Sequence, residues 1–234
     1  MRRARSLLVA TLLAAPLLAG AAERRPLAQV DLTALSSETQ LQLSGDGQFG
    51  LAWWIPAEFW AAAAARQPAG AGNDEPIARA LAPYLVLGII QADVSDLGGF
   101  TFFDRGRVQQ GLRVTHAVPG GEPRTLRPVE PDDPDVGIAL GMIRPILANA
   151  LGNAGQNMHF FTLVDAARAD APPVSPLAAG ELRIEVAGFQ GGRSGAGRIE
   201  TPLNALFVPR LCPGGRPADI RWKVCPWDGT PLPP

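Results

Sequence analysis

Apolar and polar residues alternate in short stretches of this chain, which is typical of strands with one buried face. The first stretch covers residues 41–44, and the turn signal Gly45-Asp46-Gly47 separates it from a second apolar stretch at 49–55. Glycine and aspartate favour tight turns because they tolerate backbone angles that other residues avoid. The pattern therefore predicts a β-hairpin over 41–55.

Helices are expected where apolar residues recur every three or four positions after a suitable first residue. Pro56 suits the first position of a helix, because that position needs no N–H, and this helix is predicted to run to about residue 67. A shorter helix is expected over 74–81. The pair Asp133-Pro134 predicts the start of a further helix, which Gly152 is expected to end.

Residues 85–94 are almost continuously apolar and partly β-branched, as in a strand that is buried on both faces. Further strands are predicted over 100–103, 108–118, 159–164, 181–186 and 201–208. Segments rich in glycine, proline or charge predict loops at 119–135 and 188–197. Short connections between strands favour antiparallel pairing, so the expected class is α+β: a single domain with a mostly antiparallel sheet and helices packed on one face.

The first 22 residues have the three parts of a secretory signal peptide. A basic start carries three arginines, residues 7–18 are apolar, and the small residues Ala19-Gly20-Ala21-Ala22 offer a cleavage site. The alternative is an uncleaved membrane anchor, for which the apolar stretch is short, since a bilayer core is about 30 Å thick. We therefore expect a periplasmic or secreted protein with no transmembrane segment after cleavage.

Composition narrows the class of protein further. The chain of 234 residues is 47% hydrophobic and 18% charged, which is typical of a globular protein. Without the three arginines of the leader, 18 basic and 22 acidic residues remain, which gives a net charge of −4. Nucleic-acid binding needs a basic face, so this balance argues against it. Lys223 is the single lysine among many arginines, alanines, glycines and prolines, which indicates a GC-rich bacterial genome.

The two cysteines, Cys212 and Cys225, both lie in a proline-rich segment after the last predicted strand. In an oxidising compartment the simplest expectation for such a pair is a disulfide, which would stabilise the fold by about 3 kcal/mol. The predicted organisation is therefore a signal peptide (1–22), a domain (23–208) and a disulfide-tied tail (209–234).

The two cysteine segments also echo each other. Cys212-Pro213-Gly214-Gly215 is followed by Cys225-Pro226-Trp227-Asp228, and each segment resembles one knuckle of a zinc ribbon, in which a second cysteine stands three positions after the first. Gly215 and Asp228 occupy those positions here, so a closed site of four ligands is incomplete. The resemblance leaves three readings: a disulfide in place of the metal, zinc held with outside ligands, or free thiols.

Trp53, Trp54 and Trp60 form an aromatic cluster at the junction between the predicted strand and the helix that follows it. Most of this cluster is expected to be core, but because side chains alternate along a strand, Trp53 and Trp54 are expected on opposite faces, so one of them could be exposed. An exposed tryptophan can stack on a sugar ring or anchor a protein partner. These three tryptophans are therefore the candidate binding residues.

Two glycine-rich segments partly match the motifs of a nucleotide-binding site and of a catalytic nucleophile. Residues 45–50 fit the pattern G-x-G-x-x-G, but an apolar strand follows them where a dinucleotide site needs a helix. Residues 191–197 lack the lysine of a phosphate loop and the last glycine of a nucleophile elbow. We expect the first segment to be a hairpin turn and the second a flexible loop that exposes Arg193.

The chain has two histidines, His116 and His159. His159 precedes two phenylalanines in a predicted strand and is expected to be a half-buried structural residue. A hydrolytic site would have to combine His116 with Asp93 and Asp96, which end the buried strand over 85–94.

These observations favour an exported bacterial protein that binds a protein or a component of the cell envelope and has no catalytic role. No cofactor and no metal is expected in this interpretation, and the sequence does not fix the oligomeric state. The first alternative is a small periplasmic hydrolase with an Asp/His site, and the second is a metal-binding tail related to a zinc ribbon.

Overall fold

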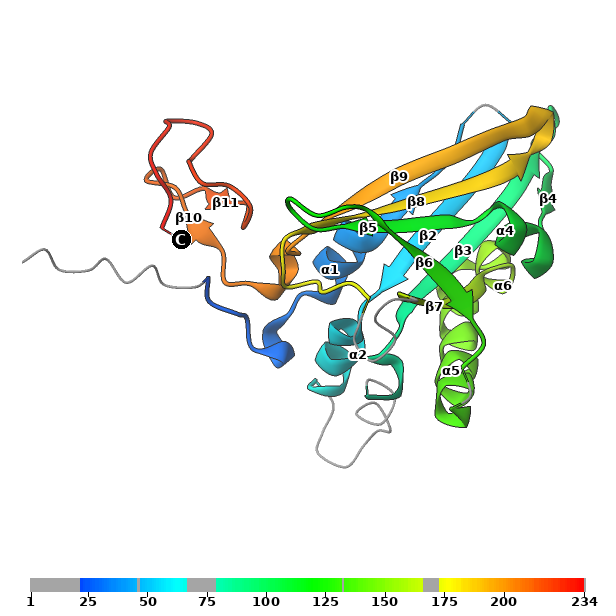
Figure 1. Cartoon of the computed structure of the whole chain (residues 1–234), viewed down its shortest axis with the longest axis horizontal. Coiled ribbons are helices and arrows are strands. Elements are labelled where there is room, and N and C mark those ends of the chain that lie inside the picture. The colour runs from blue at the N-terminus through cyan, green and yellow to red at the C-terminus, as the bar shows by residue number, and fades with distance from the viewer. Residues whose placement is uncertain (1–21, 46, 67–78, 132, 166–172, 234) are drawn as a thin grey trace, which may run out of the picture.

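The computed structural model describes residues 22–45, 47–66, 79–131, 133–165 and 173–233. It contains a mostly antiparallel sheet, several helices and a small C-terminal unit (Figure 1). The predicted signal peptide lies outside the described residues except for Ala22, and the helix expected over 74–81 is described only from residue 79.

All pairings within the main sheet are antiparallel, and the order of its strands is β1-β2-β3-β7-β6-β5-β8-β9, with β4 paired to β3. The strands are β1 (Gln40–Gln42), β2 (Gln48–Ile55), β3 (Leu85–Val94), β4 (Phe100–Phe102), β5 (Arg113–Ala117), β6 (Arg124–Val129), β7 (His159–Asp165), β8 (Gly180–Phe189) and β9 (Arg193–Thr201). The β1–β2 hairpin and the strand over 85–94 confirm two predictions.

The sheet curls until its two end strands, β1 and β9, approach each other in a nearly closed, barrel-like arrangement (Figure 1). At this seam the backbone of Leu43 lies between two glycines. A Cβ built at Gly195 of β9 would lie 2.6 Å from the Leu43 carbonyl oxygen, and a Cβ built at Gly50 of β2 would lie 3.0 Å from it. A Cβ built at Gly197 would lie 3.0 Å from the side chain of Leu41. The glycines therefore allow the seam to close.

Strands β2, β3 and β7 bury both of their faces, as the continuous apolar sequence predicts. Alternate residues enter an interior cluster enclosed by the curled sheet, represented by Trp54, Leu87 and Phe161. The residues between them enter a second cluster on the outer face, which includes Trp53 and Phe160. Two hydrophobic clusters therefore meet at these strands.

The helices are distributed over both clusters, so their packing on a single face is not confirmed. Leu35 of α1 belongs to the interior cluster, whereas Val136 and Ala139 of α5 cover the outer one. The helices are α1 (Leu32–Thr39), α2 (Ala57–Ala64), α4 (Arg105–Gly111), α5 (Pro134–Leu151) and α6 (Asn153–Gln156). Asp133 accepts a hydrogen bond from the Asp135 N–H (2.9 Å) at the start of α5, which confirms the predicted cap.

One predicted strand, over 108–118, is half helix. Helix α4 occupies its first part, because Asp104 caps the helix by accepting a hydrogen bond from the Arg107 N–H (2.8 Å). Gly111 lets the helix approach β8, since a Cβ there would lie 2.5 Å from the Ala187 carbonyl oxygen. Only β5 remains as a strand.

A strand also lies where a loop was expected over 119–135. Strand β6 pairs with β5 and β7 despite its charged sequence and Pro128, which is paired to β7 at Leu163. The pairing with β5 ends at Leu126, so Pro128 lies beyond it, where its missing N–H interrupts no ladder on that side. Leu126 points into the interior cluster and anchors the strand.

The glycine-rich segment over 188–197 is also not a loop throughout. Gly188 and Gly191 turn the chain with φ of 90° and 76°, and β9 begins at Arg193. The strand expected over 201–208 is replaced by a short 3-10 helix, η3 (Asn204–Leu206). Among the described helices, none combines the length and the apolar character needed to cross a bilayer.

Candidate binding surface on the C-terminal tail

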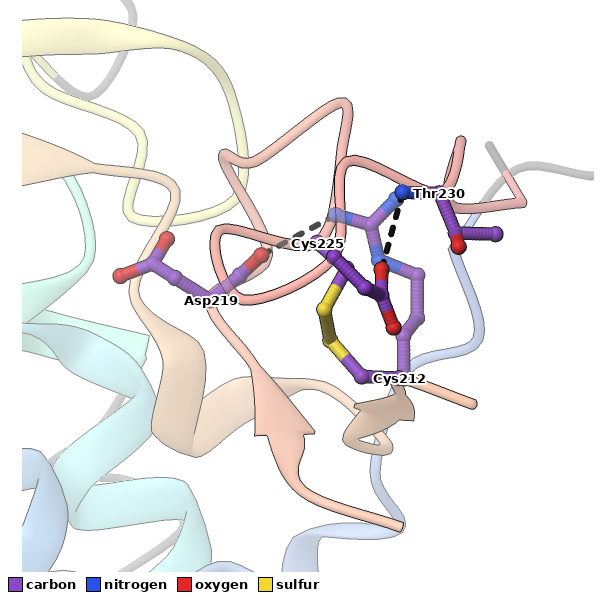
Figure 2. The surroundings of a disulfide bond; sticks show 6 residues. Cys212, Asp219, Cys225 and Thr230 are labelled. Atoms are coloured by element: carbon purple, nitrogen blue, oxygen red, sulfur yellow. Dashed lines mark hydrogen bonds between the residues drawn. A yellow bond between two sulfur atoms is a disulfide. The ribbon is translucent and has the colours of Figure 1, made fainter. Parts of the chain in front are cut away.

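The tail contains the predicted disulfide. Cys212 and Cys225 are bonded to each other with their Cα atoms 5.7 Å apart, and Figure 2 shows the bond between two loops of the chain. Because each sulfur is bonded to the other, neither is present as the thiolate that a zinc site requires. The disulfide reading of the cysteine pair is therefore confirmed.

The two Cys-Pro turns share a backbone pattern as well as a sequence. The Cys212 N–H donates to the Arg216 carbonyl (2.9 Å), and the Cys212 carbonyl accepts from the Gly215 N–H (2.8 Å). Likewise, the Cys225 N–H donates to the Thr230 carbonyl (2.8 Å), and the Cys225 carbonyl accepts from the glycine four residues later (2.9 Å). The tail is thus built from two knuckle-like turns with a disulfide between them.

Arg210 ties the loops of the tail together from inside. Its guanidinium donates to the carbonyls of Asp219 (3.1 Å), Ile220 (2.8 Å) and Trp222 (2.6 Å), and also to the carbonyl of Pro233. Strand β10 (Arg210–Leu211) pairs with β11 (Pro217–Ala218) beside it. A fixed guanidinium and a disulfide therefore hold a unit that has a very small apolar cluster of its own.

This small unit exposes two tryptophans. Trp222 is 39% exposed and Trp227 is 51% exposed, and their rings meet edge to face with centroids 5.8 Å apart. The Arg216 guanidinium lies 5.1 Å from the centroid of the Trp227 ring. We call Arg216, Trp222 and Trp227 the tail aromatic surface. Exposed aromatic rings beside a cation are typical of binding surfaces.

The tail is also basic within an acidic protein. Its charged residues are Arg210, Arg216, Arg221, Lys223, Asp219 and Asp228, a net charge of +2, whereas the whole sequence carries −1. Arg210 and Arg221 are bonded within the structure. Among the described residues, neither Arg216 nor Lys223 has an ion-pair partner. Two cations of the tail are therefore available to an anionic ligand.

A polar network docks the tail on the domain. The Glu38 carboxylate of α1 accepts hydrogen bonds from the N–H groups of Asn204 (2.6 Å) and Ala205 (2.9 Å) at the start of η3. The Asn204 side chain in turn donates to Asp219 (2.9 Å) and accepts from the Ile220 N–H (2.7 Å). The domain therefore holds the tail by directed hydrogen bonds.

Ion pairs complete this junction. Arg221 contacts Asp219 at 2.6 Å and Glu200 of β9 at 2.9 Å. Its hydrogen bond to Asp219 is the main reason why the pKa of that carboxyl falls to about 2, below its ordinary 3.8. Burial raises the pKa of Glu38 above its ordinary 4.5, in the opposite direction.

These shifts predict an acid-sensitive tail junction. Because the folded pKa of Asp219 lies below its unfolded value, its stabilising contribution is present above about pH 4 and is lost as the pH falls toward 2. We expect the difference in free energy of unfolding between the wild type and Asp219→Asn to shrink over that range. Urea denaturation at a series of pH values measures this difference. Glu38 titrates in both proteins, so its contribution cancels in the difference. A difference that stays constant down to pH 2 would contradict the prediction.

A cavity of about 370 Å³ lies where the tail meets the domain, and Glu38, Phe207, Ile220 and Trp222 are among its lining residues. A wider depression of about 610 Å³ is lined by Ile220 and Arg221 together with the start of β8 and the end of β9. The first adjoins the tail aromatic surface through Trp222. The exposed ring of Trp222 therefore stands at the rim of a hollow.

The tryptophans that the sequence singled out are not exposed. Trp53 is 5% exposed and Trp54 is 2% exposed, and they lie on opposite faces of β2 in the two different hydrophobic clusters. Trp60 is partly buried against the outer cluster. The predicted alternation is confirmed and the cluster is core, but neither strand tryptophan is exposed, because α2, α5 and the curled sheet cover both faces of β2.

The residues suggested for a hydrolytic site are far apart. Asp93 accepts a hydrogen bond from the N–H of Gln190 (2.8 Å), the residue that directly follows β8, while His116 is paired with Leu182 near the start of β8. At about 3.3 Å per residue, Leu182 and Gln190 are roughly 25 Å apart. Asp96 lies exposed in the turn after β3. The structure therefore does not bring His116 together with the two aspartates.

His116 itself is a buried residue of β5. Burial is the main cause that lowers its pKa, and the nearby Arg124 lowers it further, so the ring is neutral at pH 7. His159 contacts the Phe103 carbonyl oxygen through Nε2 (2.8 Å), as expected for a half-buried structural histidine.

The tail aromatic surface was not predicted from the sequence, since the predicted binding residues Trp53, Trp54 and Trp60 all lie in the domain. The signal was present, since Trp222 and Trp227 stand among prolines, glycines and charges, in a segment too short to bury them. Within the described ranges, no three side chains of His, Cys, Asp or Glu come together as metal ligands would. No known protein-family model matches the chain, and neither a curated protein nor a solved structure matches it.

Proposed function

We propose that this chain is an exported bacterial protein without a catalytic role, which contacts a component of the cell envelope through its C-terminal tail. The sequence of the leader supports export, and a disulfide is compatible with an oxidising compartment. The curled sheet serves as the rigid support on which the tail is docked.

The exposed pair of Trp222 and Trp227 carries this proposal. Large aromatic side chains that remain exposed are candidates for contact with a partner, because their burial releases much apolar surface from water. The disulfide and Arg210 fix the loops that present these rings, so little conformational freedom is lost on binding. Rigid exposed aromatic rings are typical of binding proteins.

The proposal is tested by sedimentation of the mature chain, beginning at Glu23, with isolated bacterial envelopes. We expect the wild type to sediment with the envelopes and the double variant Trp222→Ser/Trp227→Ser to bind roughly tenfold more weakly or worse, since two partly exposed rings are lost. Phe100→Ser is the matched control, because Phe100 is 53% exposed but lies on β4, outside the tail. Equal binding by all three proteins would refute the proposal.

A further inference from the structure

Resting on the proposed function, we propose that the envelope component is an anionic lipid surface. In this proposal Trp222 and Trp227 enter the interfacial layer of a bilayer, together with neighbouring aliphatic side chains. Arg216 and Lys223 meet the lipid phosphates. The protein would then be held at a membrane by its tail.

The exposed aliphatic residues of the tail favour a lipid over a sugar. Leu211 is 60% exposed and Val224 is 49% exposed, in addition to the two tryptophans. Tryptophan together with aliphatic and basic residues is the composition of surfaces that lie in a membrane interface.

Charge favours an anionic surface over a neutral one. Arg216 and Lys223 have no ion-pair partner among the described residues, and the tail carries a net charge of +2. Basic side chains next to a bilayer are attracted by anionic headgroups, and the attraction is screened by salt. Lipid phosphates therefore complement the two available cations.

The position of the tail fits this orientation. The tail projects from one end of the curled sheet, next to the start of the described chain, as Figure 1 shows. The Val208 N–H donates to the Glu23 carbonyl (2.9 Å), and the Arg25 N–H donates to the Leu206 carbonyl (2.9 Å). These contacts place the residues that directly follow the apolar leader sequence beside the root of the tail. A membrane that holds the leader during export would therefore be near the tail.

Vesicle flotation tests the inference with the mature chain from Glu23 in its oxidised form. The wild type is expected to float with vesicles of phosphatidylglycerol and phosphatidylethanolamine, and to bind pure phosphatidylcholine vesicles much more weakly. Trp222→Ser/Trp227→Ser should weaken binding roughly tenfold or more. Arg216→Gln/Lys223→Gln should weaken binding roughly 30-fold at low salt, because each of the two basic residues strengthens binding to an anionic surface by a similar factor.

Two matched controls remove an exposed apolar side chain and two exposed cations outside the tail. Leu97→Ser removes an exposed leucine, which is 98% exposed in the turn after β3. Arg113→Gln/Arg127→Gln removes two cations from exposed positions on β5 and β6. Both controls should bind like the wild type. Thermal unfolding of every variant confirms that the domain is folded.

The outcomes separate this inference from the proposed function. Flotation that is indifferent to lipid charge, or that the tail variants do not lower, overturns the lipid inference. If the tryptophans are needed for sedimentation with envelopes or with purified peptidoglycan but not for flotation, the ligand is a glycan or a protein, and only the proposed function stands. If they matter in neither assay, both proposals fall.

Discussion

Gly195→Ala is expected to lower the free energy of unfolding by about 1–3 kcal/mol, the usual range when atoms are forced into a packed site. The added methyl group would lie 2.6 Å from the Leu43 carbonyl oxygen, which belongs to the backbone and cannot rotate away. The seam between β1 and β9 would have to open, and Leu43 would leave the interior cluster. Urea denaturation followed by circular dichroism measures the change.

Gly141→Ala is the matched control. A Cβ at Gly141 meets nothing within 4 Å, and the residue lies inside α5, where alanine is the better helix former by about 1 kcal/mol. The same substitution should therefore stabilise the protein slightly at Gly141 and destabilise it at Gly195. Unchanged stability in Gly195→Ala would mean that the seam is not packed as described.

Reduction of the disulfide is expected to raise the rate of trypsin cleavage after Arg221 and Lys223 by about 100-fold. The bond joins residues 13 positions apart, and closing a loop of that size contributes about 3 kcal/mol, equivalent to about two powers of ten in the population of the open tail. Cleavage in the tail follows this population, since a protease needs an open chain. Mass spectrometry of the early products gives the rate at each site.

The controls distinguish stabilisation of the tail by the disulfide from stabilisation by a bound metal. A chelator alone should leave the cleavage rate of the oxidised protein unchanged, and Cys212→Ser/Cys225→Ser should be cleaved rapidly with or without reductant. Cleavage that is accelerated by the chelator, or stoichiometric zinc in the purified protein, would contradict the disulfide. A tail that resists trypsin equally in both redox states would show that Arg210 and the junction with the domain suffice to hold it.

The parts of the fold that depend on local sequence could be predicted. The β1–β2 hairpin follows from a turn between apolar stretches, β3 from a continuous apolar run, and the start of α5 from its cap at Asp133. In each case the signal lies within a few neighbouring residues. The disulfide was expected because two cysteines stand close together in the tail and the predicted export would place them in an oxidising compartment.

Two of the errors have a different cause, which is pairing with segments outside the stretch that was read. Strand β6 is charged and contains Pro128, and only its partners β5 and β7 make it a strand. The alternating glycines of β9 suggested a loop, but they are required by the approach of Leu43 across the seam. The sequence of a strand does not reveal such partners. In the case of β9, the contact is with Leu43, about 150 residues away in the chain.

The same limit applies to the candidate site. The sequence directed attention to Trp53 and Trp54, whose burial depends on helices and strands distant in the chain. The short tail is too small to bury Trp222 and Trp227, so their exposure was easier to predict than that of Trp53 and Trp54. The separation of His116 from Asp93 could not be read locally, because it follows from the order of strands in the sheet.

Fractionation of bacteria that express the full chain tests the central claim most directly. The share of protein that remains with the membranes after osmotic shock is compared for the wild type and for Trp222→Ser/Trp227→Ser. We expect both proteins to be processed near Ala22 and exported, with the wild type in the membrane fraction and the double variant in the soluble periplasmic fraction. Retention of unprocessed protein in the cytoplasm, or the same distribution for both proteins, would contradict the claim.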